Sequence, residues 1–333
     1  MKIIIPMAGL GKRMRPHTLT TPKPLLPVMG KPIIEILIED ISNMLGEKVT
    51  EVNFITGQFG KETEDMLHAI AAKFGYQSKI FYQDKAYGTA HALYCAREKL
   101  NGKVLVAFAD TLFKTDFKIN TSEEVIIWTK VIQDPTLFGV VVSDKDGYIT
   151  RFAEKSKTFV SDHAIIGIYY FRNAEILLDE IAYLIKNDIK GNNEFQITDA
   201  LENMRVKGMK MKDMSVDGWF DCGNKNATLE TNREMLKIHS RKKLISDKAI
   251  MTNSVVIDPC FIGDHVVLNN SVIGPYVSIS HSTIIENSVI SNSIIMKETL
   301  IKNANMDNSI IGSMVKYCCK RRDLNIGDFT EIV

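Results

Sequence analysis

A cationic, glycine-containing loop follows the first predicted strand of the chain. Residues 9–24, GLGKRMRPHTLTTPKP, hold two glycines and five basic residues, among them Arg13 and Lys23. Glycines let backbone N–H groups approach a phosphate closely, and prolines stiffen the loop so that its cations are already positioned. A guanidinium offers a planar fork to phosphate oxygens, whereas an ammonium supplies a point charge. The loop therefore predicts a site for a nucleoside triphosphate, with a solvated basic loop as the alternative interpretation.

Two familiar phosphate-binding motifs do not fit this loop. Gly9 and Gly11 could open a dinucleotide-binding fingerprint, but Met14 occupies the third glycine position and no acidic residue ends the second predicted strand. The sequence also lacks GxxxxGKS and GxxxxGKT, the patterns of a P-loop. Both motifs are therefore disfavoured.

The first third of the chain alternates strand-like and helix-like segments, which is typical of a mostly parallel sheet wrapped by helices. We expect strands at 2–6, 51–57, 78–83 and 104–110, and helices at 33–45, 61–74 and 89–100. Ligands of such sheets bind at the carboxyl ends of the strands. The cationic loop, segment 83–88 and Asp110 all fall at such ends, so we expect them to meet at one edge.

The middle third has a more antiparallel pattern. The segments EEVIIWTKV, FGVVVSDKDGYITRF and AIIGIYYF predict strands, and Asp146 with Gly147 predicts a turn. Helices are expected near 174–187, 196–206 and 224–239, and the basic run 241–243 is interpreted as a solvated linker.

A short unit recurs after residue 249. It reads NSVV, NSVI, HSTI, NSVI, NSII and NSII, beginning at 253, 270, 281, 287, 292 and 308. Aliphatic residues keep a spacing of five to six residues, from Val256 to Ile301, which neither a helix nor a hairpin meander produces. A β-solenoid with three short sides per coil does produce it, and the repeat predicts roughly three coils.

The stretch GLGKRMRPHTLTTPKPLLPV resembles the N-terminal signature of the sugar-1-phosphate nucleotidyltransferases, and the likeness continues along the chain. YQDKAYGTAHAL, VAFADTLF, DPTLFGVVV, FAEKSK, AIIGIYYF, NEFQITDAL and GWFDCGN follow in the family's order. The likeness is greatest to the long form of the glucose-1-phosphate thymidylyltransferases, including the terminal DLNIGDFTEI. The resemblance implies a Rossmann-like, GT-A-like mixed α/β sheet over 1–240 and a left-handed parallel β-helix of hexapeptide repeats over 249–333.

The resemblance also implies the reaction and its residues. A sugar 1-phosphate oxygen attacks the α-phosphorus of a triphosphate and releases pyrophosphate, with Mg²⁺ held by Asp110 and Asp221. The implied catalytic residues are Arg13, Lys23, Asp110, Lys155 and Asp221. The implied nucleotide-binding residues are Ala8, Gly9, Gly11, Lys12, Arg13, Gln83, Gly88 and Thr89. The implied sugar-phosphate-binding residues are Gly139, Glu154, Lys155, Gly167 and Glu194.

Each of these residues also has a simpler interpretation. Asp110 could cap the next segment, and Asp221 lies in a DxG stretch that also makes ordinary turns. Glu154 and Lys155 could be a plain surface pair, and Gln83 a hydrophilic strand end. A carboxamide can donate and accept at once, which suits thymine or uracil. We interpret His91 as a packing residue or a local hydrogen-bond partner.

Four positions depart from the family pattern. Lys12 replaces the usual threonine and Ala109 the usual glycine, both near the phosphates, where they could alter the rate. Ser156 stands where proline usually follows Glu-Lys, and Ile166 precedes the glycine of the sugar-binding strand. The last two leave the identity of the sugar open.

Composition limits the other classes of function. The formal net charge of +1 argues against nucleic acid as the main partner, and no apolar stretch approaches the ~20 residues of a membrane helix. Five cysteines without CxxC spacing predict free thiols, including Cys318 and Cys319, in a reducing cytoplasm.

Several alternatives stay open from the sequence. The triphosphate is dTTP or UTP, and the sugar 1-phosphate is expected to be glucose 1-phosphate. A UDP-N-acetylhexosamine or GDP-mannose pyrophosphorylase, or a non-catalytic regulatory homologue, is the alternative. The solenoid could instead transfer acetyl groups, with His265 or His281 as the base. We expect it to support a homo-oligomer through its outer aliphatic positions.

Overall fold

The computed structural model describes residues 1–115, 118–119, 121–156, 158–191, 193–320, 326–327 and 329. Contacts divide the chain into two compact units. The first is Met1–Leu26 with Pro32–Asn224, and the second is Pro27–Lys31 with Lys225–Val333. The predicted domain boundary between 240 and 249 stays a prediction, although contacts place residues 225–238 in the second unit.

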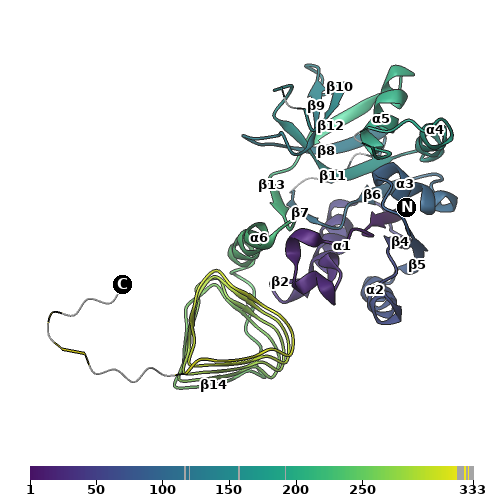
Figure 1. Cartoon of the computed structure of the whole chain (residues 1–333). Coiled ribbons are helices and arrows are strands. Elements are labelled where there is room, and N and C mark those ends of the chain that lie inside the picture. The colour runs from purple at the N-terminus through teal and green to yellow at the C-terminus, as the bar shows by residue number, and fades with distance from the viewer. Residues whose placement is uncertain are drawn as a thin grey trace. The chain divides into compact units, whose positions relative to one another are not determined.

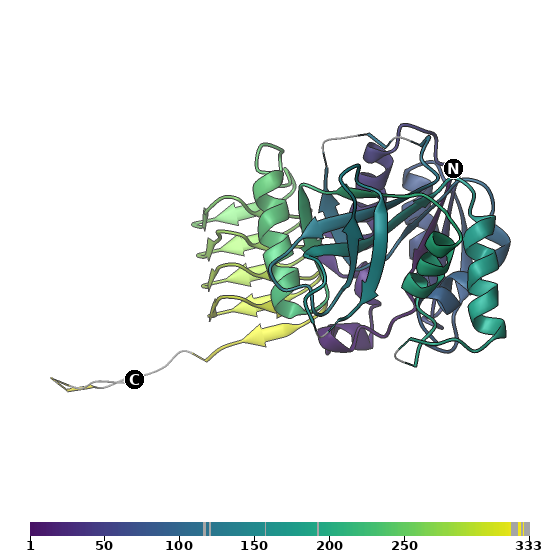
Figure 2. The same cartoon turned by 90° about the horizontal axis from the view of Figure 1, so that it is seen from above.

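A mixed sheet forms the centre of the first unit (Figures 1 and 2). Its strands are β1 (Lys2–Pro6), β4 (Glu51–Thr56), β5 (Gln77–Tyr82), β6 (Val104–Ala107), β8 (Val125–Val131), β9 (Gly139–Ser143), β10 (Ile149–Glu154), β11 (His163–Phe171) and β12 (Met211–Ser215). The order is β10-β9-β11-β6-β1-β4-β5, and β8 pairs with β11 and β12. The prediction of a mixed α/β sheet is confirmed.

Helices and short strands make up further parts of residues 1–238, of which residues 27–31 and 225–238 belong to the second unit. The helices are α1 (Ile33–Met44), α2 (Lys61–Lys73), α3 (Thr89–Cys95), α4 (Glu175–Lys186), α5 (Ile197–Val206) and α6 (Lys225–Ile238). The short strands are β2 (Pro27–Val28), β3 (Lys31–Pro32), β7 (Thr111–Lys114) and β13 (Gly218–Asp221). β7 and β13 pair in an antiparallel ribbon.

Burial on both faces explains the continuous apolar runs of the central strands. Ile3, Ile4 and Ile5 of β1 are all fully buried, although successive side chains of a strand point to opposite faces. Ile4 packs in one core with Leu93 of α3 and Leu177 of α4. Parallel strands covered by helices on both sides show this composition.

Four strands, β6, β1, β4 and β5, run parallel, so their carboxyl ends share one edge. The loop 9–24, segment 83–88 and Asp110 follow three of these strands, as the sequence predicts. The middle third is antiparallel as expected, because β11 pairs with β6, β8 and β9, and β9 pairs with β10 across the Asp146–Gly147 turn.

Two predicted elements end early. The strand predicted for 104–110 stops at Ala107, so Asp110 lies in the turn before β7. The helix predicted for 89–100 stops at Cys95 and is followed by a 3₁₀ turn, Arg97–Lys99, a common ending for α-helices. The Asn101 amide closes this turn by donating to the Glu98 carbonyl at 2.8 Å.

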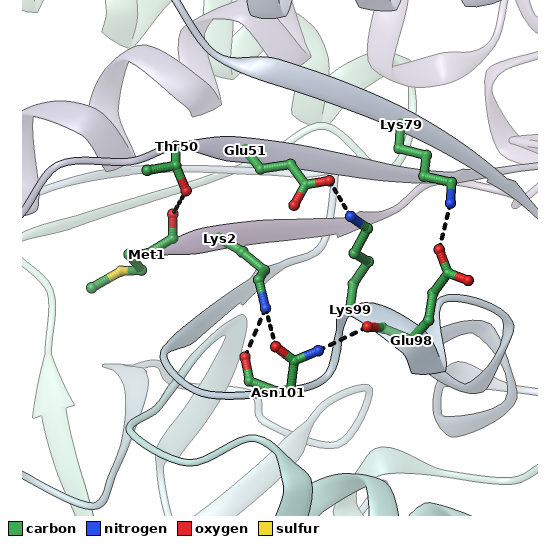
Figure 3. A network of polar contacts seen from close by, with 8 residues as sticks. All are labelled: Met1, Lys2, Thr50, Glu51, Lys79, Glu98, Lys99 and Asn101. Carbon is green, nitrogen blue, oxygen red and sulfur yellow. Dashed lines mark hydrogen bonds and ion pairs between the residues drawn. The ribbon is translucent and has the colours of Figure 1, made fainter.

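A charged network lies at the opposite, amino ends of the parallel strands (Figure 3). Glu51 at the start of β4 pairs with Lys99 of the 3₁₀ turn at 2.5 Å. Lys2 at the start of β1 donates from Nζ to the Asn101 carbonyl at 2.9 Å. Burial lowers the pKa of Lys2, and the nearby Glu51 carboxylate partly offsets this. The network therefore ties the sheet to the turn that follows α3.

Parallel strands form three further sheets in the second unit, and Figure 1 shows them stacked as triangular coils. The first sheet is β14 (Ile250–Thr252), β17 (Val267–Asn269), β20 (Ile284–Glu286), β23 (Leu300–Lys302) and β26 (Lys316–Cys318). The second is β15 (Val255–Val256), β18 (Val272–Ile273), β21 (Val289–Ile290) and β24 (Asn305–Met306). The third is β16 (Phe261–Ile262), β19 (Ser278–Ile279), β22 (Ile294–Ile295) and β25 (Ile310–Ile311).

The predicted repeat is confirmed in the stacking of these strands. The aliphatic series forms one buried core, with Ile262, Ile279 and Ile295 stacked in the third sheet. Asn253, Asn270, Asn287 and Asn303 occupy positive-φ corners, and their amides hydrogen-bond from coil to coil. The five-stranded sheet spans four coils rather than the three predicted.

Several smaller predictions concern the rest of the chain. All five cysteines are free, and residues 241–243 are exposed. Among the described residues, none of the helices has the length and apolar character that crossing a bilayer requires. Most of the DLNIGDFTEI segment lies outside the described residues.

Candidate active site

A pocket of about 260 Å³ lies at the carboxyl edge of the parallel strands. It is lined by the loops after β1, β5 and β6 and by the segment before α5. Nine of its lining residues are among those predicted for the site: Ala8, Gly9, Gly11, Lys23, Gln83, Gly88, Thr89, Asp110 and Glu194. Its other lining residues include Phe108 and Ala109.

Three consecutive 3₁₀ turns, 12–14, 17–19 and 23–25, shape the cationic loop. Gly11 has φ 57°, and a Cβ there would lie 2.9 Å from Thr18 Cγ2 and 3.2 Å from Lys23 Cβ. Thr18 Oγ1 donates to the Gly11 carbonyl at 2.8 Å. A Cβ at Gly9, in contrast, would meet nothing within 4 Å. Gly11 therefore folds the loop around Lys23, whereas Gly9 leaves open space at the pocket wall.

Lys23 and Asp110 form an ion pair, with 2.8 Å between Nζ and Oδ2. The Lys23 side chain is 13% exposed and that of Asp110 is 41% exposed, so the lysine is the more enclosed partner. The Asp110 carbonyl accepts from the Cys222 N–H at 3.1 Å, which attaches the end of β13 to the same turn.

Asp221 lies beside this pair. A Cβ placed on Gly223 would lie 3.0 Å from the Asp221 carboxylate oxygens and 3.1 Å from Arg13 Nη2. The Asp221 and Arg13 side chains therefore both lie next to Gly223. Burial, and then the Asp110 carboxylate, raise the pKa of Asp221, while Lys23 and Arg13 partly oppose them. The four predicted charged residues therefore interact electrostatically.

Two carboxylates suit a hard divalent cation that keeps most of its water. Within the described ranges, no group of three or more His, Cys, Asp or Glu side chains gathers as a metal site. Mg²⁺ needs only one or two carboxylates together with substrate phosphates. Burial and the Asp110 carboxylate raise the pKa of Asp221, and a divalent cation held by both carboxylates would oppose these two effects. Asp110 and Asp221 therefore fit the predicted role of metal ligands.

The other end of the pocket is formed around Gln83. Its Nε2 donates to the Gly88 carbonyl and contacts His91 Nδ1, both at 3.1 Å. Burial lowers the pKa of His91, which favours a neutral ring that can accept at Nδ1. Thr89 Oγ1 accepts from the Ile197 N–H at 2.9 Å and so holds the start of α5 against this loop.

Four of the five predicted sugar-phosphate-binding residues lie on or directly after β9, β10 and β11, whereas Glu194 lines the pocket itself. A Cβ on Gly139 would lie 2.8 Å from Glu154 Oε2, which accepts from Thr198 Oγ1 at 3.0 Å. Lys155 Nζ lies 3.6 Å from Glu154 Oε1. The Gly167 carbonyl accepts from the N–H of Phe108, which lines the pocket, at 2.9 Å.

The structure thus assembles the predicted residues in two groups. The residues that do not line the pocket itself are Lys12, Arg13, Gly139, Glu154, Lys155, Gly167 and Asp221. Sequence reasoning assigned no role to Gln196, Thr198 and Asp199, whereas the local hydrogen bond that it allowed for His91 is present with Gln83. Burial, and then the Glu154 charge, raise the pKa of Asp199. The signal for these residues was the NEFQITDAL segment, where only the glutamate was assigned.

The nucleotidyl transferase family model matches residues 2–238, most of the chain. The chain belongs to the sugar-1-phosphate nucleotidyltransferase family. It is therefore an enzyme of the nucleotidyltransferase class, as the sequence predicts.

Similar proteins carry related names. A glucose-1-phosphate thymidylyltransferase of Streptomyces antibioticus is 28% identical over 287 residues, 79% of this chain and 78% of that protein. The bifunctional protein GlmU of Methanocaldococcus jannaschii is 30% identical over 78% of this chain, but the match spans only 60% of GlmU. The crystal structure of a candidate glucose-1-phosphate thymidylyltransferase from Bacillus anthracis, in complex with sucrose, matches 70% of this nucleotidyltransferase and 94% of that chain. Its TM-score is 0.59 and its identity 27%.

Proposed function

We propose that this chain transfers a nucleotidyl group from dTTP or UTP to glucose 1-phosphate, giving a nucleoside diphosphate sugar and pyrophosphate. One observation carries the proposal: the Lys23–Asp110 ion pair lies in the pocket wall beside the glycine loop, and Asp221 and Arg13 act electrostatically on the same group. This arrangement offers cations to a polyphosphate and carboxylates to a divalent cation in one place.

The chain's own residues act by positioning and by neutralising charge. The Gly9–Gly11 backbone lets the triphosphate approach, while Arg13 and Lys23 bind its oxygens and stabilise charge on the departing pyrophosphate. Lys155 holds the sugar phosphate, and Glu154 accepts from a sugar hydroxyl. Since the attacking phosphate oxygen is already an anion, no side chain has to remove a proton from it.

Asp110 and Asp221 would hold Mg²⁺, which when bound neutralises phosphate charge. The pairing of Asp110 with Lys23 supports this role, because a cationic group already occupies one carboxylate oxygen. Triphosphate phosphates would draw Lys23 toward themselves, which leaves Asp110 to the divalent cation. The proposal therefore has Lys23 exchanging a carboxylate partner for a phosphate partner.

The hydrogen bonds of Gln83 support a pyrimidine base with an N–H. Its two amide hydrogens are directed to Gly88 and His91, so Oε1 is the atom left for a ligand. An acceptor there suits the N3–H of uracil or thymine and opposes the bare N3 of cytosine. This differs from the expectation that the carboxamide donates and accepts at once. A hydrophobic contact to the thymine methyl group would discriminate between dTTP and UTP only about 10–200-fold in kcat/KM, so UTP and dTTP both remain candidates.

The similar thymidylyltransferases support glucose 1-phosphate as the acceptor. A UDP-N-acetylhexosamine or GDP-mannose pyrophosphorylase would use the same charged residues and differ around Gly139 and Glu194. We also propose that the triangular coils form a left-handed β-helix and that they support a homo-oligomer. Exposed aliphatic side chains on the coils support an interface: Ile250, Val255, Ile257 and Val289.

A pyrophosphate-release assay tests the proposed reaction. The protein with Mg²⁺ is offered each of dTTP, UTP, CTP, ATP and GTP with glucose 1-phosphate, N-acetylglucosamine 1-phosphate or mannose 1-phosphate. Turnover is expected with dTTP or UTP and glucose 1-phosphate, and Asp110→Asn should lower it about 100-fold or more. Asp65→Asn, in an exposed ion pair on α2, is the matched control. No turnover across the panel would favour a regulatory homologue.

A further inference from the structure

A second pocket, of about 460 Å³, lies in the first unit and shares no lining residue with the candidate active site. Three segments surround it: the end of β9 with its turn, the stretch before β11, and β12. Its lining residues are Val142, Ser143, Asp144, Lys145, Gly147, Val160, Ser161, His163, Asp213 and Ser215. None of these residues has a place in the proposed reaction.

A buried carboxylate organises the inner wall of this pocket. The Asp213 side chain is only 6% exposed. Its Oδ1 accepts from Thr129 Oγ1 at 2.6 Å, and its Oδ2 accepts from Ser143 Oγ at 3.0 Å. His163 Nδ1 lies 2.9 Å from the same Oδ2. Three groups of the protein itself thus occupy the oxygens of this carboxylate.

The Asp213 contact also fixes the role of His163. With Nδ1 donating to the carboxylate, the imidazole presents Nε2 on its opposite edge, and the side chain is 38% exposed. Ser161 Oγ accepts from the His163 backbone N–H at 3.1 Å and keeps its own hydrogen for a ligand. The wall therefore presents the Nε2 edge of His163 and the Ser161 hydroxyl to a ligand.

A lysine without a partner lies at the rim. Lys145 is exposed and makes no hydrogen bond or ion pair within the described part of the chain. Its neighbour Asp144 is turned into its own loop, since its Oδ1 accepts from the N–H groups of Asp146 and Tyr148 at 2.9 Å. Asp144 and Asp213 thus accept hydrogen bonds from within the protein, whereas the Lys145 ammonium is available to a ligand.

Two other chemistries do not fit. Ser143 directs its hydrogen to Asp213 rather than to His163, so the three residues do not form a nucleophile with its base. A metal ion is disfavoured because both Asp213 oxygens and His163 Nδ1 already make hydrogen bonds within the protein. What remains is an anion site with hydroxyl groups around it.

We propose that this pocket binds a small phosphorylated, hydroxyl-bearing compound. Lys145 holds the phosphate oxygens, Ser161 donates to one of them, and the Nε2 edge of His163 contacts the bound compound. The volume exceeds what one phosphate needs and falls in the range of small-molecule sites. Ser143 and Ser215 accept from the hydroxyl groups of the ligand.

Histidine NMR tests the proposal without using turnover, so its failure and failure of the proposed function are distinguishable. The protein contains seven histidines, and loss of one resonance in His163→Gln assigns the signal. The intact protein is titrated at neutral pH with glucose 6-phosphate, inorganic phosphate, glucose and glucuronate. A saturable shift of His163 with the two phosphates, and none with glucose or glucuronate, supports the proposal.

A lysine variant tests the charge contribution. Lys145→Gln should raise the dissociation constant of glucose 6-phosphate about tenfold or more, because one charge-assisted contact is lost. Lys61→Gln, an exposed lysine on α2, should leave it unchanged. The proposal is overturned if the His163 resonance does not move with the phosphates, or if it moves as much with glucose. It is also overturned if Lys145→Gln binds glucose 6-phosphate as tightly as the unsubstituted protein. Because Lys145 is exposed, its replacement tests binding without disturbing the buried network.

Discussion

Replacing Asp221 with asparagine is expected to stabilise the fold while it abolishes the proposed reaction. Burial and the Asp110 carboxylate raise the pKa of Asp221, so charging this side chain costs folding free energy at neutral pH. Asparagine keeps an oxygen that can accept from the Gly223 N–H, as Asp221 Oδ1 does at 2.9 Å. The substitution therefore removes the charge and keeps the local hydrogen bond.

The pH dependence follows from the direction of this shift. Because the folded-state pKa of Asp221 lies above the unfolded one, the folded protein holds this proton to higher pH. That contribution is fully present below the unfolded pKa, about 3.9, and is lost as pH rises through the folded value. The advantage of Asp221→Asn should thus appear as pH rises and vanish in acid.

The structure also limits the size of the gain. Lys23, only 13% exposed, lies 2.8 Å from Asp110 and already neutralises much of the charge that Asp221 faces. Arg13 acts in the same direction. We therefore expect about 1 kcal/mol at neutral pH, within the usual range for removing an unfavourable functional charge. For a unit of this size the Tm should rise by about 2–4 °C.

Thermal unfolding from about pH 3, below the unfolded pKa, up to about pH 8 in EDTA provides the assay. Asp65→Asn is the control, in an exposed ion pair worth about 0–1 kcal/mol. Pyrophosphate release by Asp221→Asn should fall about 100-fold or more. A lower Tm at neutral pH, or a gain that does not change with pH, would refute the electrostatic reasoning. Full activity in the variant would refute the role of the carboxylate.

Three further predictions test separate parts of the structure. Gly9→Ala should fold normally, because a Cβ meets nothing within 4 Å, but raise the KM for triphosphate. Gly11→Ala, at φ 57° and in a close contact, should lower the free energy of unfolding by about 1–3 kcal/mol in a urea titration. Equal losses of stability in Gly9→Ala and Gly11→Ala would contradict this. His91→Phe should free an amide hydrogen of Gln83 and raise the CTP-to-UTP ratio of kcat/KM about tenfold. Glu51→Gln should lower unfolding free energy by about 1 kcal/mol or more through its lysine partner, and an unchanged urea midpoint would contradict it.

The repeat of parallel strands after residue 249 was predictable because stacking in register imposes one spacing on many residues at once. Ile273, Ile279 and Ile290 each fill the core beside an equivalent residue of the next coil, so the sequence repeats the pattern. The last strand, β26, is exposed, has no further neighbour among the described residues, and carries Tyr317 and Cys318 instead of the aliphatic pattern. Terminal repeats depart from the pattern for this reason.

The edge of the sheet that carries the candidate site was also predictable, because parallel strands fix where their loops meet. The partners across that edge were not. Thr89 accepts from the N–H of Ile197, and Glu154 accepts from Thr198, over separations of 108 and 44 residues. Such contacts depend on how α5 packs against the sheet, and no local pattern of residue types encodes that distance.

The structure differs most from the sequence-based prediction in the partners of the charged residues. Read one at a time, Lys23, Arg13, Asp110 and Asp221 are two cations for phosphate and two carboxylates for metal. In the folded chain they act on one another, so the charges largely cancel within the group. A lysine that pairs with Asp110 at 2.8 Å competes with any cation for that carboxylate, and the carboxylate competes with phosphate for the lysine. In the proposed reaction, a triphosphate that arrives together with its divalent cation satisfies both partners in one step, whereas either alone leaves one of them uncompensated.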